Sequence, residues 1–145
     1  MKHWKQTIVT LHEKTDDKTQ ITNPVEVTKM ISEILKSEKH TAYQEHFWII
    51  GLDNQNRCKM LQLVSLGGLS ATMVDPRVVF FALLSSHCSG FIAVHNHPSA
   101  NCNPSQEDEK VNKQLSDGAA LLGFRMLDFL IVSDDKFYSF SEMKI

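Results

Sequence analysis

Two histidines in the second half of the chain are spaced so that they could hold a metal ion. His95 and His97 lie one residue apart, at the end of the apolar segment "GFIAVH". Alternate side chains of an extended chain point to the same side, so both imidazoles can converge on one point. Neutral imidazole is the commonest metal ligand, and zinc accepts nitrogen and carboxylate ligands. A catalytic zinc site needs at least one further protein ligand besides two histidines.

Asp108 is the candidate for that third ligand. The segment that follows the histidines predicts a helix whose apolar positions are Val111, Leu115, Ala119 and Leu122. Three residues before Val111, on the same face and in the first turn, stands Asp108. An inward-facing carboxylate is costly unless it is paired or binds a metal.

Each feature has an ordinary structural explanation when it is taken alone. Ser105 and Asp108 form a Ser-x-x-Asp pattern, which is typical of a helix cap. His95 and His97 could be satisfied by backbone groups at the end of a strand. Taken together, two convergent histidines followed by an inward carboxylate favour a metal site.

A catalytic zinc site also needs a general base nearby. Glutamates are sparse in the middle of the chain, and none lies between Glu45 and Glu107. Glu45 starts the apolar segment 45–53, so its side chain stands at the end of a predicted element, where it can reach a cleft. A solvated residue ahead of a strand is the alternative interpretation of Glu45.

The surrounding pattern predicts an α/β fold with a mixed β-sheet flanked by helices. Apolar alternation and turn residues predict strands, and 3.6-residue periodicity predicts helices, in the order β-α-β-β-α-β-α-β-β. Polar residues where a central strand ends and a helix begins are typical of ligand sites in such folds. The strands are predicted over 6–14, 45–53, 57–67, 90–97, 124–133 and 136–142, and the helices over 23–40, 76–87 and 105–123.

Composition sets limits on the class of protein. The chain has 145 residues and a net charge of −2, with no basic excess that would suggest binding to nucleic-acid phosphates. Three cysteines without regular spacing argue against a disulfide framework and favour a cytoplasmic location. The polar N-terminus is unlike a signal peptide, and no apolar run is long enough to span a membrane. We expect one domain over 1–145, with an N-terminal strand and loop over 1–22 and a catalytic core over 23–145.

The segment "HNHPSANCNPSQED" resembles the signature of the JAMM (JAB/MPN) metalloproteases. That signature is His-x-His-Pro, six residues, Ser, two residues, Asp, and every spacing is matched here. The flanking segments "FWIIGLDNQNR", "LSATMVDPRVV" and "LLGFRMLDFLIVSDDKFYSFSE" are similar to the RadC branch of that superfamily. Asn96 stands between the histidines, where many JAMM peptidases have serine. The RadC branch has asparagine at that position. The resemblance covers roughly residues 25–145 and implies the JAB/MPN architecture, which is related to that of cytidine deaminases.

The resemblance also implies roles for single residues. It implies Zn²⁺ held by His95, His97 and Asp108, with Glu45 as the general acid and base and Ser105 as a donor to the oxyanion. The implied reaction is hydrolysis of a peptide or isopeptide amide, with a protein substrate such as a ubiquitin-like tail. The β-hairpins could pair across a homodimer.

Other functions fit the sequence less well. A cytidine deaminase would need His-x-Glu and Pro-Cys-x-x-Cys, which the chain lacks, and the letters "HNH" do not make an HNH nuclease. A non-catalytic MPN scaffold is the main rival, although all the ligands and the glutamate are present. A DNA-repair association through the RadC branch is the third option. That branch usually carries an N-terminal helix-hairpin-helix region, for which we expect no room here.

Overall fold

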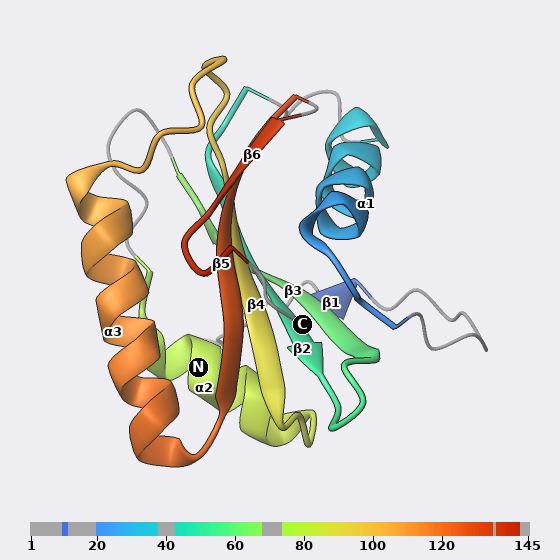
Figure 1. Ribbon diagram of the computed structural model, residues 1–145, viewed down its shortest axis with the longest axis vertical. Helices are drawn as coiled ribbons and strands as arrows, with labels where there is room; N and C mark the ends of the chain where they lie inside the picture. Colours follow the sequence, from blue (N-terminus) through green and yellow to red (C-terminus); the bar gives the residue numbers. More distant parts are fainter. Residues whose placement is uncertain (1–9, 12–19, 38–42, 68–73, 135, 143–145) are drawn as a thin grey trace, which may run out of the picture.

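The computed structural model describes residues 10–11, 20–37, 43–67, 74–134 and 136–142. Within these residues the chain forms three helices and a six-stranded sheet, in the order β-α-β-β-α-β-α-β-β (Figure 1). The predicted α/β class and element order are therefore confirmed. The helices are α1 (Pro24–Ser37), α2 (Pro76–Ser85) and α3 (Gln106–Leu122).

The sheet is mixed, with strand order β1-β3-β2-β4-β5-β6. Neighbouring strands are antiparallel except for β4 and β5, which run parallel and are connected through α3. The two central strands, β2 and β4, are buried along their whole length. The strands are β1 (Thr10–Leu11), β2 (His46–Leu52), β3 (Cys58–Leu66), β4 (Gly90–Asn96), β5 (Arg125–Ser133) and β6 (Lys136–Ser139).

Helices cover both faces of the sheet, with α1 on one side and α2 and α3 on the other (Figure 1). Because side chains alternate along a strand, β2 contributes Phe47 and Ile49 to the core under α2 and α3. It contributes Trp48 and Ile50 to the core under α1. Such two-sided burial accounts for the unbroken apolar runs in β2 and β4.

The sequence located most element boundaries within a few residues. Two predictions need correction. The last strand ends at Ser139 rather than at residue 142. Leu122 was expected to face inward but is 50% exposed, because α3 ends there at the left-handed Gly123 cap and Phe124 packs against the core instead.

Part of the sequence pattern cannot be compared with the structure. Only Thr10–Leu11 of the first predicted strand, residues 6–14, is described as a strand, and the rest of it lies outside the described residues. The end of the first predicted helix, residues 38–40, also lies outside them. Within the described part of the chain, no helix has the length and apolarity needed to cross a bilayer. Cys58, Cys88 and Cys102 are free thiols.

Candidate metal centre

The two histidines lie where the central strand β4 ends. His95 is within β4 and is buried, on the face that carries Phe91 and Ala93 and is covered by α2 and α3. His97 follows two residues later, and its backbone N–H donates to Val132 of the parallel strand β5. The imidazole rings lie 5.0 Å apart between centroids and nearly perpendicular to each other. The expectation that the two rings converge is confirmed.

Asp108 is held by the start of α3. Ser105 is the N-cap residue, and its hydroxyl accepts from the backbone N–H of Asp108 at 3.1 Å. In return the Asp108 carboxylate accepts from the backbone N–H of Ser105 at 2.7 Å, which completes a capping box. The predicted cap therefore exists, and it fixes the direction in which the carboxylate points.

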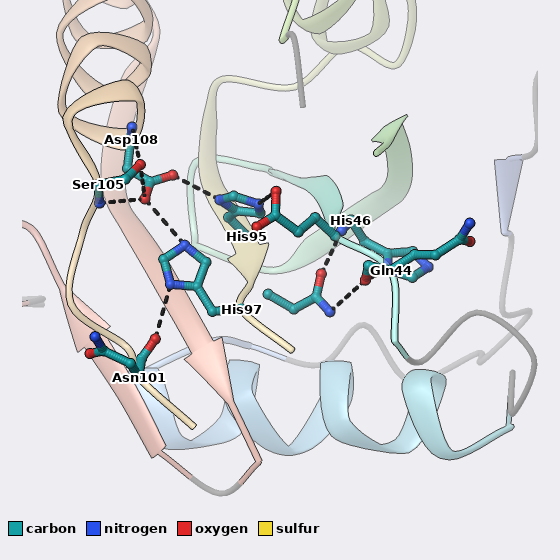
Figure 2. Close-up of polar contacts among 9 residues, drawn as sticks. Gln44, His46, His95, His97, Asn101, Ser105 and Asp108 are labelled. Atoms are coloured by element: carbon teal, nitrogen blue, oxygen red, sulfur yellow. Dashed lines mark hydrogen bonds and ion pairs between the residues drawn. The ribbon is translucent and has the colours of Figure 1, made fainter. Parts of the chain in front are cut away.

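That carboxylate contacts both histidines (Figure 2). Asp108 Oδ1 lies 2.8 Å from His95 Nδ1, and Asp108 Oδ2 lies 3.2 Å from His97 Nε2. An ionised carboxylate only accepts, so in the neutral imidazole of His95 the hydrogen lies on Nδ1 and Nε2 keeps its lone pair. The other nitrogen of His97, Nδ1, lies 3.0 Å from the backbone oxygen of Asn101.

Glu45 reaches the same place from the neighbouring strand. It directly precedes β2, on the face of Phe47, and Phe47 is paired with His95 across the sheet. Glu45 Oε2 lies 3.6 Å from His95 Nε2. That Nε2 is buried and has no hydrogen-bond partner among the described residues. A buried imidazole nitrogen with a free lone pair, next to a carboxylate, fits a metal ion.

The carboxylates also set the charge state of the site. Burial by itself would raise the pKa of Asp108, but hydrogen bonds from His95, His97 and Ser105 outweigh it and hold that pKa well below its usual range. The hydrogen bond to Asp108 raises the pKa of His97, against the opposing effect of burial. Asp108 is therefore ionised at neutral pH and ready to bind a cation.

These side chains border a cavity of about 830 Å³. Its walls combine the end of β2, the loop after β4 and the first turn of α3. Exposed Tyr43 stands at its edge. The cavity is large enough for a segment of a peptide or another small substrate. Each of the five predicted site residues contacts at least one of the others, and all five line the cavity.

The sequence and the structure emphasise different sets of ligands. One ligand atom each from Glu45, His95 and His97 lies within 4.8 Å of the other two, so these three residues form a group that can hold a metal ion. The sequence predicts Asp108 in place of Glu45, and that ligand set stays a prediction. Asp108 contacts both histidines, so it is placed either to bind the metal itself or to orient the imidazoles that do.

Sequence reasoning did not assign two residues that support this site. The backbone oxygen of Asn101 contacts His97, and a backbone contact leaves no signal in side-chain types. Asn96 is buried between the two histidines and contacts the chain on both sides of Glu45. A polar residue at the end of an otherwise apolar strand was the available signal for Asn96.

Comparison with known proteins places the chain in a family. Residues 21–145 match the model of the RadC-like JAB domain. A UPF0758 protein of Flavobacterium johnsoniae is 40% identical over 96 residues, which are 66% of this chain and 42% of that protein. UPF0758 proteins of Caldanaerobacter subterraneus and Methanosarcina mazei are each 34% identical, over 84% and 88% of this chain and 51% and 54% of theirs. The chain thus spans about half the length of the curated relatives it matches, and it belongs to the RadC-like JAB domain family.

Proposed function

We propose that this chain is a zinc-dependent metallohydrolase that cleaves a peptide or isopeptide bond. The observation that carries the proposal is the meeting of His95, His97, Asp108 and Glu45 beside one cavity, with the Nε2 of His95 buried and without a hydrogen bond among the described residues. Two imidazoles and a carboxylate are a ligand set typical of catalytic zinc.

In this proposal His95, His97 and Asp108 hold the ion. A bound zinc ion would supply Lewis acidity, which polarises a carbonyl and lowers the pKa of water at the site. Asp108 is suited to this because its pKa is low, so it does not have to lose a proton before it binds a cation. The capping box and the Asn101 carbonyl fix the carboxylate and one imidazole in advance, which reduces the ordering that binding requires.

Glu45 carries the proton in the proposed reaction. About a third of its side chain is exposed, and its Oε2 lies 3.6 Å from His95, so the carboxylate faces both the ligands and the cavity. It takes a proton from the attacking water and later delivers that proton to the leaving amine. Asp108 is less suited than Glu45 to transferring this proton, because contacts with three residues hold its carboxylate.

Ser105 is proposed as a donor to the developing oxyanion. Its hydroxyl carries one hydrogen, which it donates to Asp108 Oδ2 at 2.8 Å. A hydrogen bond to substrate would therefore compete with this contact. The backbone capping contacts of Ser105 would hold α3 in place while the hydroxyl turns.

The first test is the metal content of the purified protein. About one zinc per chain is expected in the unmutated protein, and none in the double variant His95→Ala/His97→Ala. An unmutated protein that stays folded yet binds no zinc, even after incubation with it, would refute the hydrolase and leave a scaffold with vestigial ligands.

A second test separates the two ligand sets. If Asp108 is a ligand and Glu45 is the base, Asp108→Ala should weaken zinc binding far more than Glu45→Ala does. The reverse order would make Glu45 the third ligand. Glu45→Ala is also the inactive control for a screen of fluorogenic peptides and isopeptide-linked conjugates, because it should keep zinc and lose hydrolysis.

A further inference from the structure

Asn96 stands between the two histidines but points to the opposite side of the sheet. Side chains alternate along β4, so His95 faces α3 while Asn96 lies on the face of Val94, towards α1. It is nevertheless only 2% exposed. Its side chain is therefore not placed to bind the metal, and its buried amide must be satisfied in another way.

The amide is satisfied by the backbone on both sides of Glu45. Asn96 Nδ2 donates to the carbonyl oxygen of Gln44 at 3.0 Å, and Asn96 Oδ1 accepts from the backbone N–H of His46 at 2.5 Å. Figure 2 shows Gln44 and His46, the two residues whose backbone groups form these hydrogen bonds. A carboxamide has both a donor and an acceptor, so one side chain can hold both peptide groups.

These contacts continue the sheet one step beyond its backbone pairing. The pairing of β2 with β4 runs from Leu52 and Gly90 to Phe47 and His95 and ends there. From the other side, the backbone N–H of Gly67, just after β3, donates to the carbonyl oxygen of Glu45 at 2.7 Å. The backbone around Glu45 is thus held on one side by Asn96 and on the other by Gly67.

We propose that Asn96 is a positioning residue that fixes Glu45 against the metal centre by clamping the backbone of Gln44 and His46. A general base acts only from within hydrogen-bonding reach of the proton it takes, so a small displacement of Glu45 would be costly. This role deepens the proposed function and rests on it, since it gives Glu45 the part of the base. The clamp itself can be measured without any metal.

The test is amide hydrogen exchange followed by NMR on the metal-free full chain. In the unmutated protein the amides of His46 and Gly67 should exchange slowly. In Asn96→Ser, whose side chain is too short to hold both groups, exchange at both amides should be at least roughly tenfold faster. The amide of Ile50, in the middle of β2, should be unchanged. Gly67 is the decisive probe, because it contacts Glu45 and is not a hydrogen-bond partner of Asn96.

A second variant and a control keep the result interpretable if the serine variant unfolds. Asn96→Asp keeps the acceptor for His46 but puts an oxygen in place of the donor for Gln44, and that oxygen repels the Gln44 carbonyl, so this variant should also speed exchange at Gly67. Asn54→Ser makes the same chemical change in the exposed turn beyond the far end of β2 and should change neither amide. Faster exchange at His46 alone, or at neither amide, would overturn the inference.

Zinc binding by the same variants separates this inference from the proposed function. An unmutated protein that binds no zinc would refute the hydrolase but leave the exchange result standing. If the unmutated protein binds zinc, Asn96→Ser should bind the same amount, because Asn96 acts on Glu45 and not on the ligands. Loss of zinc from Asn96→Ser, in a protein whose Glu45→Ala variant keeps zinc, would mean that Asn96 acts on the histidines, and the positioning role would be wrong. If Glu45→Ala loses zinc as well, Glu45 is a ligand rather than the base, and the positioning role fails with it.

Discussion

Two buried aspartates, one in α3 and one in β5, have different hydrogen-bond partners. Asp108, in the first turn of α3, is 4% exposed, and Asp128, in β5, is 2% exposed. Asp128 accepts hydrogen bonds from the hydroxyl of Ser139 and from the backbone N–H groups of Phe129 and Ser141. Asp108 accepts from the N-cap residue and from two imidazoles.

The difference shows how a structural carboxylate and a functional one are built. The donors to Asp128 are hydroxyl and backbone groups, which do not titrate near neutral pH and do not bind metals. Two of them, from Ser139 and Ser141, connect β5 to the end of β6. Imidazoles as a class titrate near neutral pH and can bind a metal ion, and the two on Asp108 stand beside a cavity. Burial is thus the same at both sites, and the partners decide the chemistry.

The largest effect on folding is expected at Asp128. Asp128→Ala would leave a partly buried hydroxyl and two backbone N–H groups without their acceptor, so the free energy of unfolding should fall by about 3 kcal/mol. Urea denaturation measures this change. Asp128→Asn, which keeps an acceptor oxygen, should lose clearly less. Equal losses in the two variants would show that the hydrogen bonds do not account for this aspartate.

A smaller effect is expected at the helix start that holds Asp108. Ser105→Ala removes the N-cap hydroxyl, and the free energy of unfolding should fall by about 1 kcal/mol. Ser105→Thr keeps a hydroxyl and should restore most of the loss. If Ser105→Ala left stability unchanged in urea, the capping box would not be what fixes Asp108.

The smallest effect is expected at a third carboxylate, Asp53, in the turn after β2. Hydrogen bonds from the backbone N–H of Arg57, from its side chain and from Gln55 lower the pKa of Asp53 from 3.8 to about 2, against the opposing effect of burial. Because the folded pKa is the lower one, this contribution to stability is present above about pH 4 and is lost as the pH falls towards 2.

Asp53→Asn provides the check on that carboxylate. The unmutated protein should lose more stability between pH 5 and pH 3 than Asp53→Asn does, as measured by urea denaturation at both pH values. The two proteins would show the same pH dependence if Asp53 titrated normally in the folded state.

The sequence anticipated Asp108 and overlooked Asp128 for a physical reason. Helical spacing from Val111 places Asp108 inward, and local spacing is visible in a sequence. The side-chain partner of Asp128, Ser139, lies 11 residues further along, after a turn, where no local period links the two. Leu122 shows the limit of helical spacing as a guide to burial. Its spacing places it on the inward face, but it is exposed because the helix ends there.

The fold was more predictable than the contacts within the site. Alternation along a strand places Glu45 and His46 on opposite faces, and His46 does stack on Trp48, on the α1 side of the sheet. The clamp by Asn96 depends on contacts across 50 and 52 residues, which no spacing within one element reveals. Strand pairing must be known before such a contact can be inferred.

Zinc affinity most directly tests whether Asp108 belongs to a metal centre. It should be measured by competition with a chelator in three proteins: the unmutated chain, Asp108→Asn and Asp128→Asn. Both variants replace a buried aspartate by its isostere, and both should be checked for folding. We expect Asp108→Asn to weaken zinc binding by at least roughly a hundredfold and Asp128→Asn to leave it within about threefold. Equal affinities in the two folded variants would contradict the assignment of Asp108 to a metal centre.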